Sequence, residues 1–324
     1  MLDFFKNIAQ KKVLIIGDSM IDAYMWGDVH RMSPEAPVPV LDIHTKENRL
    51  GGAANVALNI NSLGAIPILC TMIGADQDGL EFKRLLEESS LTAEGLYIEE
   101  GRKTTIKTRI INGDKHLLRI DDEHIEDLEH KDSFLALVKD ILAKEKVDVV
   151  IFEDYNKGLL TEEIITESIQ LFKTEGIPMI VDPKKKNFLK YRGVDIFKPN
   201  LKELKEGLGV EFDQKDPIEL SKAVQILKEK LNCEAVLLTL SEDGVFILNE
   251  SGYFTEKAKE RNIIDVSGAG DTVVSVAALA LANNLSMSDL AKISNISGGL
   301  VCEKVGVVPI DKMELKEEVE KILL

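Results

Sequence analysis

A short segment near the carboxyl end of the chain carries the residues that most strongly suggest chemistry. Residues 265–272 read Asp-Val-Ser-Gly-Ala-Gly-Asp-Thr and lead directly into an apolar helical stretch. Glycines at the start of a helix let the backbone N–H groups of Gly268, Ala269 and Gly270 converge on an anion, and the helix dipole adds positive potential there. Asp271 has the wrong charge for binding an anion, which indicates a base beside it. A plain glycine-rich helix start, with Asp271 as a cap, stays open as the alternative.

Two other segments place polar side chains at predicted helix starts. Gly51 and Gly52 precede Asn55, so that a bare backbone and a side-chain amide could both meet sugar hydroxyls. The same cluster could be only a tight turn from strand to helix. Asn200 and Glu203 have the spacing of a helix capping box. Glu203 could also reach water on a Mg²⁺ ion beside a nucleotide.

The chain is strongly acidic. Its 324 residues include 40 Lys plus Arg against 56 Asp plus Glu, a formal net charge of −16. This field repels phosphate polymers and anionic lipid, so we expect neither nucleic acid nor a membrane surface as a partner. An apolar share of 44% is that of a folded globular protein. A phosphorylated ligand would need local groups that reverse the field.

Cysteine use and the position and length of apolar runs indicate the cellular compartment. Cys70, Cys233 and Cys302 are odd in number and far apart, so we expect reduced thiols in the core and neither disulfides nor structural zinc. Residues 1–12 contain no apolar stretch of the kind found in signal peptides. The longest apolar run, 273–282, is about half the length that spans a bilayer. These features predict a cytoplasmic protein.

The pattern along the chain predicts an α/β fold. Short runs rich in β-branched residues alternate with segments of helical period, which is typical of a mainly parallel sheet covered on both faces. The predicted strands are 13–17, 66–73, 147–152, 178–182, 195–198 and 235–239, and the predicted helices are 127–144, 161–174 and 217–231. Ligands bind beyond the carboxyl ends of such strands. Asp18, Asp154 and Asp182, at three strand ends, should therefore face one ligand edge.

Two segments interrupt this alternation and predict a small β lid over the ligand edge. The segment near 22–50 contains three prolines within 33–40, which exclude a helix and permit turns or an edge strand. The segment near 102–121 alternates, turns at Asn112-Gly113 and resumes, which predicts a hairpin. We expect a single domain over 1–324 with this discontinuous lid.

Several common chemistries lack their sequence marks. No glycine is followed by lysine, so the chain has no P-loop. The five histidines form no His-Glu-x-x-His, and no Gly-x-Ser-x-Gly elbow occurs. No Gly-x-Gly-x-x-Gly follows the first strand, which disfavours a dinucleotide-dependent oxidoreductase.

Taken together, the turn at 268–271, the Gly-Gly-x-x-Asn at 51–55, the Asn-x-x-Glu at 200–203 and the split lid resemble the ribokinase-like sugar kinases of the PfkB type over nearly the whole chain. The resemblance implies a three-layer αβα sandwich with a mainly parallel sheet and a small β lid. Further segments are similar to the heptose 7-phosphate kinases of that family, namely 33–40, 51–57, 154–158 and 191–193. The resemblance is to a stand-alone kinase without an adenylyltransferase domain.

The activity implied by this resemblance is transfer of the ATP γ-phosphoryl group to the anomeric hydroxyl of D-glycero-D-manno-heptose 7-phosphate. The product would be the 1,7-bisphosphate that feeds ADP-heptose and lipopolysaccharide core synthesis. Asp271 would be the base, and the N–H groups of Gly268, Ala269 and Gly270 would stabilise the transferring phosphoryl group. A kinase for another sugar or sugar phosphate, or a non-catalytic sensor of sugar or nucleotide on the same fold, remains as an alternative.

The resemblance also implies binding roles for three groups of residues. Sugar hydroxyls would contact Asp18 or Asp22, Gly51, Gly52, Asn55 and Asp154, and the sugar phosphate would contact a subset of Lys107, Arg109, Lys157 and Lys184. The nucleotide would contact Asn200, Glu203, Thr239, Ser241, Gly244 and Asn295. Mg²⁺ would lie near Asn200 and Glu203, held largely by ATP oxygens and water, and K⁺ would lie near Asp265 and Ser267. The open edge of the lid predicts a homodimer with lids packed together.

Overall fold

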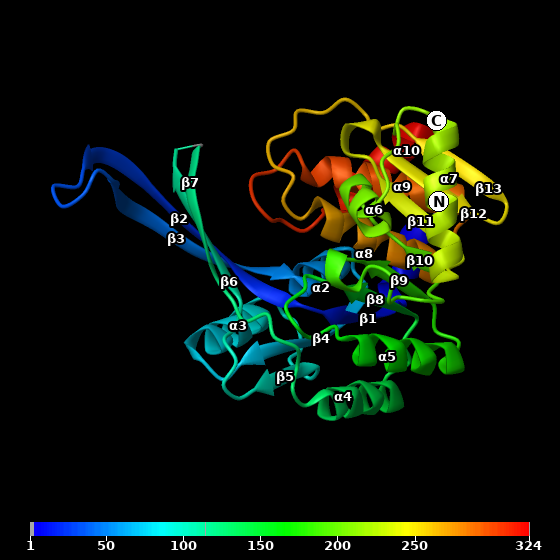
Figure 1. The fold of residues 1–324 in the computed structure, drawn as a ribbon, viewed down its shortest axis with the longest axis horizontal. Helices are drawn as coiled ribbons and strands as arrows, with labels where there is room; N and C mark the ends of the chain where they lie inside the picture. Colours follow the sequence, from blue (N-terminus) through cyan, green and yellow to red (C-terminus); the bar gives the residue numbers. More distant parts are fainter. Residues whose placement is uncertain (1–2, 114, 324) are drawn as a thin grey trace.

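The structure, a computed structural model, describes residues 3–113 and 115–323. Figure 1 shows a central sheet with helices on both faces and a second sheet that projects from one end of the molecule. The predicted α/β class is confirmed.

The central sheet has nine strands in the order β13-β12-β11-β10-β9-β8-β1-β4-β5. Their bounds are β1 (Lys12–Gly17), β4 (Ile66–Gly74), β5 (Leu96–Glu99), β8 (Val149–Glu153), β9 (Met179–Asp182), β10 (Ile196–Phe197), β11 (Ala235–Thr239), β12 (Val245–Asn249) and β13 (Gly252–Glu256). All pairings from β5 to β11 are parallel, and β12 and β13 add antiparallel strands at one edge. The six predicted strands are present, and β5, β12 and β13 are additional.

Alternate residues of the central strands feed two separate apolar cores. Val13 and Ile15 of β1 face the core that contains α2 (Ala53–Ser62), α3 (Gln77–Glu88), α8 (Ala269–Ala282), α9 (Met287–Val301), α10 (Lys312–Leu323) and the short α1 (Phe4–Asn7). Leu14 and Ile16 face the core that contains α4 (Lys131–Lys144), α5 (Glu162–Glu175), α6 (Leu201–Leu208) and α7 (Pro217–Leu231). This two-sided burial explains the continuous apolar runs of the strands.

The predicted helices are present, with differences at their starts. Thr161 caps α5 as expected, because its side chain accepts a hydrogen bond from the N–H of Ile164. Helix α4 begins at Lys131 and not at residue 127. The N–H of Leu128 bonds the carbonyl of Gly158, and the N–H of Glu129 bonds the Glu99 carboxylate. These contacts hold the preceding residues in a loop.

The second sheet is the lid, and both segments predicted for it contribute strands. Its order is β3-β2-β6-β7, with β2 (Ser19–Met32), β3 (Pro39–Gly52), β6 (Ile106–Asn112) and β7 (Lys115–Asp122). Strands β2 and β6 pair in parallel across more than eighty residues of sequence. The prolines at 34 and 37 lie in the turn between β2 and β3, where the N–H of Ser33 bonds the carbonyl of Val38. In Figure 1 the β2–β3 ribbon reaches far beyond the body.

Cys70, Cys233 and Cys302 are buried free thiols, as the sequence predicts. Among the described residues, no helix combines the length and the apolar character needed to cross a membrane.

The buried Arg102 joins the lid to the body. Its side chain is 3% exposed and forms an ion pair with Glu99 at the end of β5. It also donates hydrogen bonds to the carbonyl oxygens of His124, Glu126 and Lys157. One guanidinium group therefore ties together β5, the start of the lid hairpin, the loop before α4 and the loop after β8.

We expect Arg102→Met to lower the free energy of unfolding by about 3 kcal/mol, because it leaves a buried carboxylate and several carbonyl groups without their partner. The control is Arg84→Met, since Arg84 forms only exposed ion pairs with Glu81 and Glu88 and such pairs contribute little. Urea unfolding of both variants measures the difference. Equal small losses in the two variants would show that Arg102 does not hold this junction.

Candidate active site

Three elements hold the carboxylate of Asp271 in place. Gly268 adopts φ of 79° at the start of α8, which puts Asp271 in the first turn of that helix. Asn55 in α2 donates from Nδ2 to one carboxylate oxygen at 2.7 Å, and the hydroxyl of Tyr155 donates to the other at 2.9 Å. Tyr155 follows β8, so the sheet, α2 and α8 meet at this one group.

The environment of Asp271 suits a base. Its side chain is buried, and burial raises the pKa of the carboxyl group above the ordinary value for aspartate. The hydrogen bond from Asn55 opposes this rise, repulsion by Asp182 adds to it, and the hydrogen bond from Tyr155 also opposes it. A raised proton affinity, with two donors that support the ionised form, fits a group that accepts a proton during a reaction.

Charged groups of both signs surround Asp271. One carboxylate oxygen from each of Glu153, Asp182 and Asp271 lies within 4.8 Å of the other two, a spacing at which a divalent cation could be held. Two lysines already face this group: Lys198 Nζ lies 2.9 Å from one oxygen of Asp182, and Lys184 Nζ lies 3.9 Å from the other. The ammonium groups offset much of the negative charge that a cation would otherwise balance.

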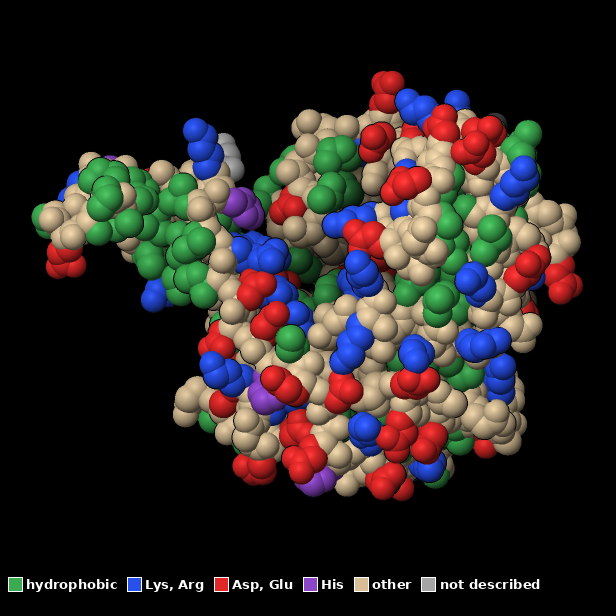
Figure 2. Space-filling model, viewed as in Figure 1, with side chains coloured by type: hydrophobic (Ala, Val, Ile, Leu, Met, Phe, Trp, Pro, Cys, Tyr) green, Lys and Arg blue, Asp and Glu red, His purple; other side chains and the backbone are tan. Residues whose placement is uncertain are grey.

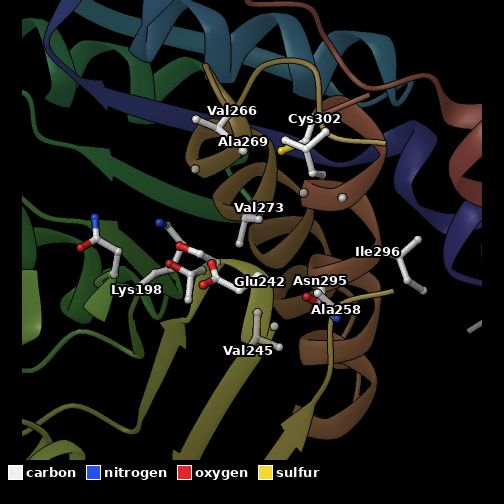
Figure 3. A pocket seen from close by; sticks show the side chains of 18 of the residues that line it. Lys198, Glu242, Val245, Ala258, Val266, Ala269, Val273, Asn295, Ile296 and Cys302 are labelled. Carbon is white, nitrogen blue, oxygen red and sulfur yellow. The ribbon is translucent and has the colours of Figure 1, made fainter. Parts of the chain in front are cut away.

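A cavity of about 870 Å³ opens beside Asp271, and every residue that the sequence predicts for the nucleotide lines it. Predicted residues that line it are Asn200, Glu203, Thr239, Ser241, Gly244, Asn295, Gly268, Ala269, Gly270, Asp271 and Lys184. In Figure 3, Val245, Val273 and Asn295 lie around one part of the cavity, and Lys198 lies across from them. The cavity thus has an apolar part beside a cationic part. This arrangement suits a nucleotide, which has a flat nucleobase and negatively charged phosphates.

The expected capping box is present at the start of α6, and it uses both the N–H and the side chain of Glu203. The N–H of Glu203 bonds the side chain of Asn200, and one Glu203 oxygen accepts the N–H of Asn200 at 2.8 Å. The other oxygen accepts Lys184 Nζ at 2.9 Å. Glu203 thus caps a helix and lines the cavity at the same time.

Sequence reasoning missed several residues of this site. Tyr155 and Lys198 were not predicted, although each touches a carboxylate of the group around Asp271. Lys198 directly follows β10, just as Asp182 ends β9. The expectation that residues at strand ends face the ligand edge was applied only to acidic residues, and it would have found Lys198 if basic residues had been included. Tyr155 had no such signal, because its partner is 116 residues away in the chain.

Asp18 and Asp154, predicted to contact the sugar, hold a loop in place. Asp18 accepts hydrogen bonds from the N–H groups of Tyr155, Lys157 and Leu159 at 2.9 to 3.2 Å. Asp154 accepts from the side chains of Asn187 and Tyr191 at 3.0 and 2.8 Å. Burial raises the pKa of Asp154 to about 6. These bonds shape the loop that presents Tyr155, and contact with the sugar stays a prediction.

The other residues predicted for the sugar lie together where the lid meets α2. Asp22 in β2 pairs with Arg109 in β6, and both side chains are mostly buried. A Cβ added at Gly51 would meet a carboxylate oxygen of Asp22, so a larger residue there would displace this side chain. Gly52 adopts φ of 60°, and Asn55 follows in the first turn of α2.

The predicted phosphate partners are divided between two places. Lys107 and Lys157 both pair with Glu123, at 3.1 and 2.7 Å, and Arg109 pairs with Asp22, so these three lie near the lid. Figure 2 shows Lys and Arg side chains gathered in the hollow between lid and body. Lys184 instead lines the nucleotide cavity.

Asp265 links the turn before α8 to a loop that contacts the lid. One Asp265 oxygen accepts the N–H of Ser267 and the other accepts the N–H of Gly306, both at 2.9 Å. These hydrogen bonds outweigh burial and lower the pKa of Asp265. Arg49 in β3 donates to the carbonyl of Val307 at 3.2 Å. The lid therefore contacts the loop that is bonded to Asp265.

Comparison with known proteins agrees with this geometry. Residues 10–313 match the model of the pfkB family of carbohydrate kinases. The chain belongs to this family. It is therefore a carbohydrate kinase, and the expectation from the sequence motifs is confirmed.

Curated relatives of this chain carry the name bifunctional protein HldE, and two of them serve as examples. The protein from Desulfatibacillum aliphaticivorans is 38% identical over 313 residues, which is 95% of this chain and 63% of the relative. The protein from Sulfurimonas denitrificans is 38% identical over 309 residues, 94% of this chain and 64% of the relative. The chain thus spans less than two thirds of the length of these relatives.

Solved structures share the fold at low identity. Escherichia coli phosphofructokinase-2 in complex with potassium has a TM-score of 0.78 and 19% identity, with 97% of this chain and 99% of the other covered. Arabidopsis thaliana ribokinase complexed with ribose and ATP has a TM-score of 0.71 and 16% identity, with 95% and 99% covered. The fold is ribokinase-like, as predicted.

The two donors to Asp271 predict a shift in the pH dependence of the kinase reaction. Asn55→Ala removes the hydrogen bond that most lowers the pKa of Asp271, so this pKa should rise. The base is then protonated at higher pH, and the acid limb of the kcat/KM profile should move to higher pH. The control is Asn61→Ala, because Asn61 is exposed on the same helix. An unmoved acid limb in Asn55→Ala would mean that Asp271 does not set it.

Proposed function

We propose that this kinase transfers the ATP γ-phosphoryl group to the anomeric hydroxyl of D-glycero-D-manno-heptose 7-phosphate and releases the 1,7-bisphosphate. The position of Asp271 supports the proposal most strongly. Asp271 lines the cavity that contains the residues predicted for the nucleotide, and it accepts a hydrogen bond from Asn55, one of the residues predicted for the sugar. The motif resemblance to heptose 7-phosphate kinases, together with the 38% identity to proteins named HldE, supports this choice of sugar.

In this proposal Asp271 accepts the proton of the attacking hydroxyl while the γ-phosphoryl group leaves ADP. Asn55 and Tyr155 keep the carboxylate oriented, since each donates to a different oxygen. Residues 268–270 line the cavity, and the N–H of Ala269 bonds the carbonyl of Val266 at 3.3 Å. In this proposal the N–H groups of this helix start stabilise the negative charge on the transferring group. Lid closure excludes water, which limits hydrolysis of ATP.

The residues around Glu203 fit a Mg²⁺ ion that is carried by the nucleotide. Both Glu203 oxygens already accept hydrogen bonds, from Lys184 and from the N–H of Asn200, so Glu203 would reach the ion through water. The ion would offset phosphate charge. Asp265 and Ser267 remain the proposed place for K⁺, because they directly precede the turn at 268–271.

For the sugar side, we place the hydroxyls against Asp22, Gly51, Gly52 and Asn55 and the 7-phosphate against Lys107, Arg109 and Lys157. These three cations now pair with Asp22, Asp121 and Glu123. A phosphate with two negative charges can replace such partners. Lys184 faces the nucleotide cavity, so we assign it to the phosphates of ATP.

ADP release across a panel of sugars and sugar phosphates tests the function. We expect heptose 7-phosphate to give the highest kcat/KM. Asp271→Asn should still bind ATP and lose about a hundredfold or more in turnover, the scale of a lost positioned base. Preference for an unphosphorylated pentose or hexose would favour a different PfkB substrate. Failure of the wild type to release ADP with every sugar would favour a sensor.

We also propose a homodimer through the lid. The lid exposes large apolar side chains on both of its ribbons, namely Met32, Val38, Ile43, Leu117, Leu118 and Ile120. Figure 2 shows that apolar side chains cover much of the lid where it extends beyond the body. Exposed apolar surface and open strand edges are usually covered by a partner, and a second copy presents the same surface.

The mass in solution at micromolar concentration should be twice that of the chain. Ile43→Glu together with Leu118→Glu should shift the protein to the monomer, because two charges would be buried at the interface. Ile218→Glu on α7 is the control, since Ile218 is 64% exposed and lies outside the lid. A monomeric wild type would contradict the proposal.

A further inference from the structure

Glu153 is a buried acid that neither the family motifs nor the proposed reaction uses. It is the last residue of β8, its exposure is 0%, and neither carboxylate oxygen has a hydrogen-bond partner. On the neighbouring strand its partner in register is Gly17. A Cβ there would stand 2.8 Å from the Cβ of Glu153, so the absence of a side chain at Gly17 leaves the room that Glu153 occupies.

The side chain of Glu153 lies beneath Asp271 in a row of charged groups. Glu153 and Asp182 are partners in register on β8 and β9, and Lys198 follows β10 and bonds Asp182. The titratable groups that act on Glu153 are Asp182, Asp271, Lys184 and Lys198, with Tyr155 and Tyr191 close enough to be influenced by it. On β1 the next residue, Asp18, is bonded to the loop after β8.

Negative charge already exceeds positive charge around Glu153 when Glu153 itself is neutral. Asp182, Asp271 and Glu203 carry three negative charges, whereas Lys184, which pairs with Glu203, and Lys198 carry two positive charges. An ionised Glu153 would add a fourth negative charge without a partner and without water, which is costly in a protein interior. Burial, and then repulsion by Asp182 and Asp271, raises the pKa of Glu153 well above its ordinary value.

A bound metal ion is the other way to neutralise this group, and the contacts disfavour it. The oxygens of Asp271 are taken by Asn55 and Tyr155, and those of Asp182 face the two lysines. Glu153 alone would offer free oxygens. A cation there would also lie close to two ammonium groups, whereas a proton on Glu153 avoids that repulsion.

We propose that Glu153 is held as a neutral carboxylic acid beneath Asp271 and serves as a positioning residue for phosphoryl transfer. Its neutral state keeps a further negative charge away from the start of α8, where charge on the transferring phosphoryl group develops. The catalytic part of this inference rests on the proposed function. The protonation of Glu153 does not, so the two can fail separately.

Infrared spectroscopy tests the protonation without any turnover. The wild type at neutral pH should show a carbonyl band of a protonated carboxylic acid that is absent from Glu153→Gln. The control is Glu99→Gln, because Glu99 is also buried but is paired with Arg102, and it should keep the band. Absence of the band in the wild type overturns the inference, as does binding of Mn²⁺ without nucleotide that Glu153→Gln abolishes.

Unfolding as a function of pH gives a second readout. In the folded protein Glu153 keeps its proton at pH values at which the unfolded chain releases it, so the wild type loses stability as pH rises above about 4.3, the value for an unperturbed glutamate. Glu153→Gln escapes this loss. The folding equilibrium constant of Glu153→Gln, divided by that of the wild type, should therefore grow by up to about tenfold per pH unit. A constant difference between the two proteins would contradict the inference.

The pH profile of the kinase reaction tests the positioning role. The kcat/KM for ATP of the wild type should fall at alkaline pH, where Glu153 ionises and repels the phosphoryl group. Glu153→Gln cannot ionise, so its alkaline limb should disappear while turnover at neutral pH stays within about tenfold of the wild type. Identical alkaline limbs would remove the positioning role. A retained infrared band would then still show that the acid is protonated.

Discussion

The pair of hydrogen bonds to the Asp271 carboxylate is the interaction on which the rest of the structure depends. Asn55 reaches it from α2 and Tyr155 from the loop after β8, while Asp271 itself starts α8. Neighbouring bonds reinforce the same junction, since Thr272 donates to the side chain of Asn59 at 3.0 Å. Asp271 is thus fixed by the two helices and the strand that build the core, and a shift in any of them moves it.

The acidic composition and the phosphate chemistry are compatible because the site reverses the field locally. The chain carries a net charge of −16, yet Lys184, Lys198 and the start of α8 line the cavity beside Asp271. Lys107, Arg109 and Lys157 lie on the lid side and are held by the acidic partners Asp121, Glu123 and Asp22. In the proposed complex a compact phosphate takes the place of these carboxylates at the three cations.

Much of the fold was accessible from the sequence, because buried parallel strands need continuous apolar runs. Residues 13–17 and 235–239 are examples in which β-branched composition and length leave little choice. Strand β13 was missed because its residues are mostly exposed and show no apolar run. Strand β5 was missed because four residues carry too little pattern. The lid could be predicted as two segments, since prolines and the Asn-Gly turn are local signals.

The site divides in the same way. Asp271, Gly268 and Asn200 stand in short motifs whose spacing is visible in the chain. Tyr155 contacts Asp271 on helix α8, and Lys198 and Glu153 lie beside Asp182 on a neighbouring strand. Their roles depend on packing and on register across the sheet, which no local pattern gives. Asp18 was predicted from its place at a strand end, and that place is equally suited to holding a loop.

Phosphorus NMR of the products, after incubation with ATP and heptose 7-phosphate, tests the central claim most directly. The claim is that Asp271 activates the anomeric hydroxyl next to the nucleotide cavity. It predicts ADP together with a new phosphate resonance coupled to the anomeric proton, formed by the wild type and not by Asp271→Asn. Appearance of ADP and inorganic phosphate alone, or equal product from Asp271→Asn, would contradict the account.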